Sequence, residues 1–192
     1  HVVDRRHLST GGGLLALQGA KLRDAGEDAA AIAAALREMA ECVDTSFVLD
    51  TLQYMWKGGR CSGVTALGAN LLKLKPCLQM QEGKLVVGKK YRGPIDKVYR
   101  QYVAERFEGK DVLPEHVFIT HSGGVAQGTL DALVQQVQQA VPGCEVDEIL
   151  RLGAVHGVQG GHLLGVGGLK LAVAAAVLLN ALDDGGKPVR GL

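Results

Sequence analysis

Apolar positions along the chain recur with two periods, one typical of helices and one typical of strands. Between residues 27 and 42, apolar Ala30, Ile32, Leu36 and Met39 follow a period close to 3.6 residues, which predicts a helix. The other predicted helices cover residues 9–25, 94–107 and 125–141, and the predicted strands cover residues 47–49, 74–80, 85–90, 117–120 and 145–150. Strands and helices that alternate at these lengths indicate an α/β layered fold.

Two of the predicted strands form a hairpin. Glu82-Gly83 separates the run 74–80 from the run 85–90 and suits a tight turn. Pro76 cannot donate a hydrogen bond to a neighbouring strand, so its strand is expected either at a sheet edge or with an irregular start.

The first predicted helix opens with Ser9-Thr10-Gly11-Gly12-Gly13. Ser9 can serve as the N-cap, since its hydroxyl can accept hydrogen bonds from the first unpaired backbone N–H groups. The glycines let another group approach closely, and a helix start with free N–H groups and the positive end of the helix dipole suits an anion. Two interpretations stay open: a capped tight turn, or an anion-binding helix start.

Composition narrows the possible functions. The chain has 192 residues, which suggests one domain or two small ones. Hydrophobic residues make up 47% and aromatic residues only 4%, so aliphatic and small side chains must form the core. The formal net charge is +1, with 21 basic and 20 acidic residues, and this balance gives no sign of nucleic-acid binding.

The cysteines and the apolar segments bear on the cellular compartment. The four cysteines, at positions 42, 61, 77 and 144, have neither CxxC nor zinc-site spacing, and are expected to be reduced thiols of a cytoplasmic protein. No basic region followed by an apolar run opens the chain, so no signal peptide is expected. The apolar stretch 163–182 is interrupted by polar residues and glycines, and is expected to be buried without spanning a membrane.

No catalytic group is evident. His121 and Ser122 are adjacent on a predicted strand, so their side chains should point to opposite faces, and no acidic partner is evident. We therefore expect neither a catalytic residue nor a metal site.

The region from residue 47 to 93 has a specific order: a short strand, a turn of helix, a Gly-Gly-Arg corner, a small-residue helix and a hairpin. Its distinctive residues are Phe47, Asp50, Thr51, Leu52, Tyr54, Lys57, Gly58, Gly59, Arg60, Lys75, Pro76, Gly83, Lys90 and Arg92. In these residues the chain resembles the DegV family, two-domain bacterial proteins that hold a long-chain fatty acid between their domains.

The resemblance, which covers about residues 2–165, implies a DegV-like, EDD-type two-domain α/β architecture. It consists of a remnant of a first parallel-sheet domain and a second α/β/α domain with a mixed sheet. The expected divisions are 1–45 for the ligand-binding remnant, 46–167 for the second domain with its hairpin, and 168–192 for an extra C-terminal helix, ending near residue 182, and a tail. The family's chain begins several strand–helix units earlier, so this chain is expected to be N-terminally truncated and to associate or misfold alone.

The resemblance also implies a lipid-binding site. Ser9 matches the family serine that contacts the fatty-acid carboxylate, and Thr10, Gly11 and Gly13 belong to the same motif. The residue after Asp4 is usually Ser in the family and is Arg5 here, which is a departure from the pattern.

Two further lipid-binding residues are expected downstream. Arg60 is expected near the domain cleft, where it adds positive potential; alternatively, it is a charge that complements a helix C-terminus. Gln159 occupies the place of the family's head-group histidine, in a register that also allows Val158.

The implied function is a fatty-acid carrier without turnover of its own and without a cofactor. It would present the bound carboxylate to a separate fatty acid kinase, with Lys90 and Arg92 on the partner-binding face, and would neither bind nucleic acid nor insert stably into a membrane. One alternative is a small-molecule phosphotransferase, because the second domain's architecture resembles that of dihydroxyacetone kinases. Against it, the sequence has no GxxxxGK[ST] loop and no evident carboxylate pair for Mg²⁺. The other alternative is an inert fragment.

Overall fold

The computed structural model describes residues 1–51, 74–114, 117–122, 125–151 and 172–178. The helices are α1 (Ser9–Asp24), α2 (Ala29–Cys42), α4 (Ile95–Phe107) and α5 (Gln127–Ala140). The strands are β1 (Val43–Leu49), β2 (Leu74–Gln81), β3 (Lys84–Arg92), β4 (Val117–Ser122), β5 (Val146–Arg151) and β6 (Ala172–Leu178). The four helices predicted from the apolar pattern are confirmed, and their ends agree to within two residues.

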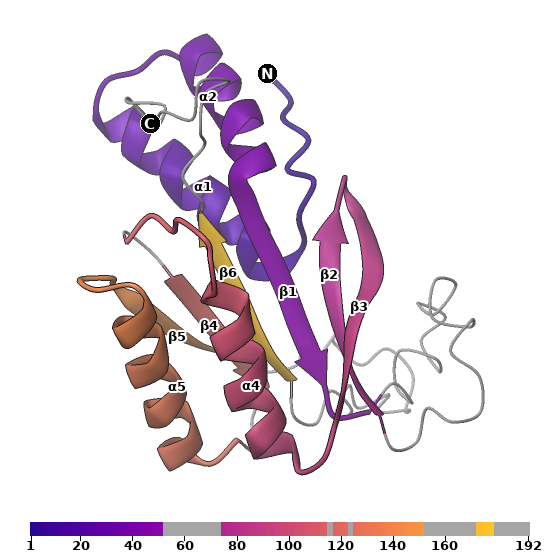
Figure 1. Cartoon of the computed structure of the whole chain (residues 1–192). Coiled ribbons are helices and arrows are strands. Elements are labelled where there is room, and N and C mark those ends of the chain that lie inside the picture. Colours follow the sequence, from indigo (N-terminus) through magenta and orange to yellow (C-terminus); the bar gives the residue numbers. More distant parts are fainter. Residues whose placement is uncertain (52–73, 115–116, 123–124, 152–171, 179–192) are drawn as a thin grey trace, which may run out of the picture.

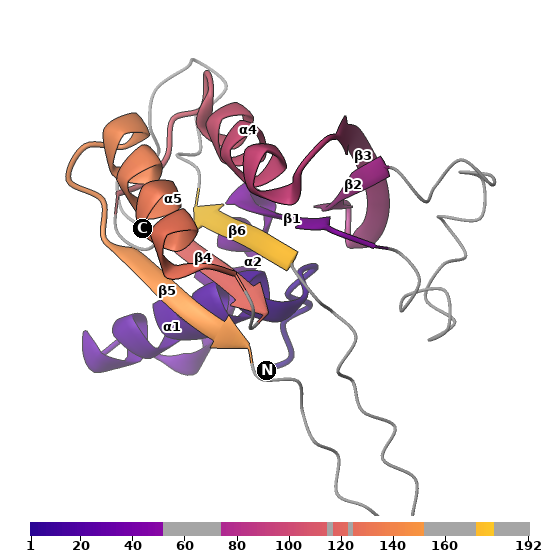
Figure 2. The same cartoon turned by 90° about the horizontal axis from the view of Figure 1, so that it is seen from below.

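The strands form one mixed sheet in the order β3-β2-β1-β6-β4-β5. β4 and β5 pair in parallel, and the other neighbouring strands pair antiparallel. In Figure 1 the helices α4 and α5 lie in front of the sheet, and in Figure 2 the pair α1 and α2 covers the opposite face. The described part of the chain therefore has three layers, with the mixed sheet in the middle.

Strands β1 and β4 contribute to both cores, because successive side chains on a strand point to opposite faces. Val48 and Ile119 lie in the larger core, which α4 and α5 cover with Tyr99 and Leu133 among others. Phe118, next to Ile119 on β4, lies in the smaller core beneath α1 and α2. The same alternation decides which polar side chains of these strands meet α1.

The prediction of a C-terminal helix was wrong in its described part. Residues 172–178 form β6, which pairs antiparallel with β1 on one side and with β4 on the other. The alanines at positions 174–176 favour a helix by intrinsic propensity, but pairing on both sides gives the backbone its hydrogen bonds in a strand. β6 is therefore a central strand of the sheet and not an appended element.

The predicted hairpin is confirmed, with Glu82 and Gly83 both at positive φ in the turn between β2 and β3. β2 lies between β3 and β1, so the edge position considered for Pro76 was wrong. The register shift between Pro76 and Leu78 agrees with the alternative, an irregular strand. The boundary expected between residues 45 and 46 lies inside β1, and the division of the chain into two domains stays a prediction.

Candidate functional site

Helix α1 begins without a capping side chain. Leu8 occupies the N-cap position in an extended conformation, and its side chain accepts no hydrogen bond from the backbone N–H groups of the first turn. Ser9 is the first helical residue and has a positive φ of 54°, so the prediction that it is the N-cap was wrong. The Leu8 carbonyl accepts from the Gly11 N–H over 3.2 Å, but the leucine side chain offers no acceptor, so the start of α1 is suited to an external anion.

The first turn of α1 lies directly on the sheet. A Cβ added at Gly11 would overlap Thr45 Oγ1 on β1, and it would lie 3.0 Å from the Cβ of His7. The Thr120 hydroxyl on β4 donates to the Thr10 hydroxyl over 3.3 Å, and both residues are buried. The missing side chain at Gly11 thus permits α1 to approach the sheet closely, with Gly11 against Thr45 of β1 and Thr10 bonded to Thr120 of β4.

The other two glycines of the motif face different surroundings. A Cβ added at Gly12 would lie 2.8 Å from Cδ and 3.2 Å from Nε and Nη1 of Arg5, so the Arg5 side chain covers this glycine. Gly13 is exposed, and nothing lies within 4 Å of an added Cβ. Of the expected site residues Ser9, Thr10, Gly11 and Gly13, the structure brings all four to one helix start, with Gly13 turned away from the sheet.

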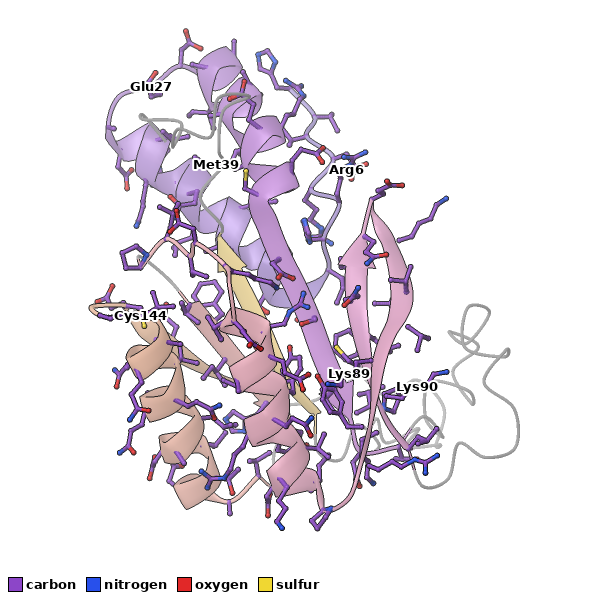
Figure 3. All side chains as sticks on the ribbon, in the orientation of Figure 1. Arg6, Glu27, Met39, Lys89, Lys90 and Cys144 are labelled. Carbon is purple, nitrogen blue, oxygen red and sulfur yellow. The ribbon has the colours of Figure 1, made fainter. Side chains whose placement is uncertain are left out.

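The segment before α1 is held against α2. His7 Nε2 donates to the carbonyl oxygen of Ala40 over 2.9 Å, because a carbonyl oxygen can only accept. Arg6 forms an ion pair with Glu41 of α2, and Figure 3 shows Arg6 between α2 and the tip of the hairpin. The part-buried His7 contact holds residues 5–8 near the first turn of α1, whereas the exposed Arg6–Glu41 ion pair adds little.

The opposite face of β1 carries a second set of polar residues. The Ser46 hydroxyl lies 2.7 Å from the Tyr102 hydroxyl of α4, and both residues are buried. Asp44 forms ion pairs with Arg106 and Lys110, and all three side chains are largely buried. Because these side chains face α4, they hold β1 to that helix and do not contribute to the site at α1.

Burial perturbs several ionisable groups on this face, among them Cys77 and Tyr99. Burial raises the pKa of the Cys77 thiol to about 11, against the opposing effect of Arg106. Burial, with a smaller contribution from the Asp50 carboxylate, also raises the pKa of Tyr99 well above its usual range. Both groups are therefore neutral near pH 7, and neither has the activated character of a nucleophile or general base.

Two residues from the family pattern form an ion pair. Lys75 at the start of β2 pairs with the Asp50 carboxylate, and its ammonium also donates to the Asp50 carbonyl over 2.9 Å. The pair is partly buried and ties the end of β1 to the start of β2. We assign it a structural role, holding the strand ends from which residues 52–73 depart and return.

The basic residues Lys89, Lys90 and Arg92 of β3 are divided between the two faces of the strand. Lys89 pairs with Glu105 of α4, whereas Lys90 and Arg92 are exposed and occupy the alternate strand positions. Figure 3 labels Lys89 and Lys90 as neighbours on this edge strand. Burial would raise the pKa of Glu105, but hydrogen bonds from Lys89, Gln101 and Tyr91 outweigh it and lower that pKa.

Several expected residues cannot be placed, and others were missed. Arg60 and Gln159 lie outside the described residues. Sequence analysis did not find Thr45 or Thr120, because a threonine on a strand carries no local signal of a distant contact. Arg5 was noticed only as a departure from the family pattern.

Among the described residues there is no cluster of three or more metal-ligating side chains, and none of the helices there is long and apolar enough to cross a membrane.

Comparison with known sequences gives one consistent result. The model of the DegV family of uncharacterised proteins matches residues 1–170. A DegV domain-containing protein from Streptomyces coelicolor is 30% identical over 168 residues, which are 86% of this chain and 58% of that protein. Another, from Caldanaerobacter subterraneus, is 33% identical over 92 residues, which are 48% of this chain and 33% of that protein. The chain thus spans between 33% and 58% of the length of these two relatives.

Solved structures show the same fold. A fatty-acid-binding DegV family protein from Streptococcus agalactiae superposes with a TM-score of 0.69 at 25% identity, over 93% of this chain and 59% of that one. The fatty acid kinase (Fak) B3 protein of Streptococcus pneumoniae, solved loaded with linoleic acid, superposes with a TM-score of 0.72 at 16% identity, over 94% and 60% of the two chains. These likenesses confirm the expected α/β fold of the DegV type.

Proposed function

The chain belongs to the DegV family, and we propose that it binds a long-chain fatty acid and presents the carboxylate to a fatty acid kinase, with no turnover of its own. Two solved neighbours support the ligand class: the S. agalactiae protein binds fatty acids, and the S. pneumoniae protein holds linoleic acid. The kinase partnership is suggested by the name of the second neighbour. Because this chain spans only part of both, the whole activity is a proposal.

The observation that carries the proposal is the uncapped start of α1. The Leu8 side chain provides no acceptor for the first turn, in which the Leu8 carbonyl accepts from the Gly11 N–H over 3.2 Å, and Ser9 stands at the first helical position. A carboxylate placed there would accept hydrogen bonds from the amides and gain from the positive end of the helix dipole. Charge-assisted hydrogen bonds of this kind offset the cost of removing a carboxylate from water.

The acyl chain supplies the larger part of the binding energy. Each buried CH₂ contributes about 0.8 kcal/mol, so a long acyl chain gains on the order of 10 kcal/mol gross. We propose Arg60 and Gln159, which lie outside the described residues, as further lipid-binding residues that act on the head group. The kinase would dock on Lys90 and Arg92, which are exposed on the edge strand β3.

The ligand class is tested by native mass spectrometry of the chain produced in bacteria. We expect an added mass equal to that of a long-chain fatty acid, and loss of that mass after delipidation. A folded, ligand-free chain that also fails to take up palmitic acid afterwards would refute fatty-acid binding.

The head-group assignment is tested by Ser9→Ala, with palmitic acid and 1-hexadecanol as matched ligands. One charge-assisted hydrogen bond is worth about 1.5–3 kcal/mol, so affinity for the acid should fall roughly ten-fold to over a hundred-fold, with a smaller loss for the alcohol. Because Leu8 and not Ser9 is the N-cap, stability without ligand should not fall by the roughly 1 kcal/mol that a lost N-cap costs. Equal losses for both ligands would refute a carboxylate contact at Ser9.

The partner face is tested by Lys90→Glu combined with Arg92→Glu. Phosphorylation of the bound acid by a bacterial fatty acid kinase should fall, and it should fall by more than the affinity for the acid does. An unchanged phosphorylation rate would refute a kinase contact at this face.

A further inference from the structure

Arg5 covers the first turn of α1. Its Cδ, Nε and Nη1 atoms lie 2.8–3.2 Å from the position that a Gly12 side chain would occupy. Because a Cβ on a helix points toward the helix N-terminus, this position lies over the turn that contains Leu8 and Ser9. Gly12 is buried as a result, while the Arg5 side chain itself remains exposed.

The positive charge of Arg5 is not balanced within the described residues. No hydrogen bond or ion pair of its guanidinium is found there, and no acidic residue lies in the first turn of α1. Its neighbour Arg6 provides the contrast, because it pairs with Glu41. A cation beside the positive end of a helix dipole is unfavourable, so both features call for the same neutralising partner, an anion.

A second, independent observation concerns the sheet side of the same turn. Thr45 is only 1% exposed, and its hydroxyl, which has no hydrogen-bond partner in the described structure, is directed at Gly11. Buried polar atoms normally have a partner, so this hydroxyl is an unsatisfied donor in the absence of a ligand. The first turn of α1 is thus flanked by an unpaired cation on one side and an unpaired hydroxyl on the other.

We propose that Arg5 is a specificity-determining head-group residue, whose guanidinium donates to the ligand carboxylate at the start of α1. This inference rests on the proposed fatty-acid binding and goes beyond it by assigning the discrimination between anionic and neutral ligands. Arg5 suits the task, because a guanidinium matches a carboxylate with two parallel N–H groups. The family usually has Ser at this position, so the guanidinium is a departure of this chain from the family pattern.

The test compares Arg5→Gln, Arg5→Lys and Arg6→Gln in the 192-residue chain, with palmitic acid and 1-hexadecanol displacing a fluorescent fatty acid. Arg5→Gln should weaken acid binding about ten-fold and change alcohol binding less than about two-fold, since only the acid carries the charge. Arg5→Lys should retain part of the affinity, because it keeps the charge but loses the fork. Arg6→Gln removes an equal charge one residue away and should leave the acid-to-alcohol ratio unchanged. Higher salt should reduce the difference between wild type and Arg5→Gln, since the side chain is exposed.

A second variant moves the guanidinium without removing it. The Cβ of Gly12→Ala would overlap the Arg5 side chain, which must swing away, so acid binding should fall while the net charge stays the same. Thermal unfolding of each variant confirms that it is folded.

Three outcomes would overturn the inference. Equal losses for acid and alcohol in Arg5→Gln, or no loss for either, would remove the head-group role. The same loss in Arg6→Gln would show a general charge effect. A wild-type chain that binds neither ligand would overturn the proposed function together with the inference, whereas acid binding of undiminished affinity in Arg5→Gln overturns the inference alone.

Discussion

Gly11→Ala is the most direct probe of how α1 sits on the sheet. The new Cβ would overlap Thr45 Oγ1, and it would lie 3.0 Å from the His7 Cβ and 3.1 Å from the Thr45 Cβ. Ordinary van der Waals contacts of a Cβ begin near 3.4 Å. Rotating the Thr45 hydroxyl away would leave the two carbon contacts too short, so α1 itself must move.

The magnitude follows from a comparison with Gly13→Ala. Replacing a helical Gly by Ala stabilises by roughly 0.5–1 kcal/mol, and this gain is common to both variants. Overpacking a close-packed site costs about 1–3 kcal/mol, and only Gly11→Ala incurs it, because nothing lies within 4 Å of a Cβ at Gly13. The difference between the two variants isolates that cost, so Gly11→Ala should be less stable than Gly13→Ala by about 1–3 kcal/mol.

The assay is urea unfolding followed by circular dichroism, with both variants and the wild type fitted to a common m-value. Adding Thr45→Ala to Gly11→Ala removes the hydroxyl that overlaps and should restore part of the loss, since residues in contact couple by about 0.5–3 kcal/mol. If Gly11→Ala proves as stable as Gly13→Ala, the close packing of α1 on β1 is refuted.

Three further predictions concern the other face of the sheet. Asp44→Asn should destabilise the fold by about 2–3 kcal/mol in urea unfolding, because it leaves two largely buried cations without their carboxylate. The control Asp24→Asn removes a carboxylate from a mostly exposed ion pair and should cost under about 0.5 kcal/mol. Equal costs for the two variants would contradict the burial argument. The pKa of Glu105 is lowered in the folded state, so its carboxylate stabilises the fold above the usual pKa of 4.5, and this stabilisation is lost as the pH falls below that value. The wild type should therefore lose more stability than Glu105→Gln between about pH 5 and 3. Parallel curves of stability against pH for the wild type and Glu105→Gln would refute the pairing. Cys77, with its pKa raised to about 11, should resist alkylation by iodoacetamide at pH 8 until urea unfolds the chain. Alkylated Cys77 in the native protein, detected by mass-spectrometric mapping, would contradict its burial.

Local signals in the sequence predicted the elements whose formation is local. Helix α4 follows Pro94 and repeats apolar residues at helical spacing, and the β2–β3 hairpin is marked by Glu82-Gly83, so both could be predicted. β6 could not, because its conformation depends on pairing with β1 and β4, which lie far away in the sequence. Intrinsic propensity is the weaker influence where a segment is paired on both sides.

The candidate site divides in the same way. The motif from Ser9 to Gly13 was found from its glycines, but the sequence could not say which glycine meets which neighbour. The ion pair between Asp50 and Lys75 joins two residues of the family pattern, yet resemblance alone gave each residue without its partner. Contacts between residues 25 or more positions apart are set by the sheet order, which no local pattern in this sequence reveals.

The three consecutive glycines of α1 therefore meet three different constraints. At Gly11 a side chain is excluded by the sheet, which is a requirement of packing and applies with or without a ligand. At Gly12 a side chain is excluded by Arg5, and a flexible arginine could move aside, so this glycine is needed only if the guanidinium must stay over the first turn. At Gly13 no neighbour excludes a side chain, and a glycine there gives up helix stability without a packing reason. Such a loss is understandable where a ligand approaches the backbone. Alanine at Gly11 should therefore lower stability, whereas alanine at Gly12 or Gly13 should lower ligand affinity without a comparable loss of stability.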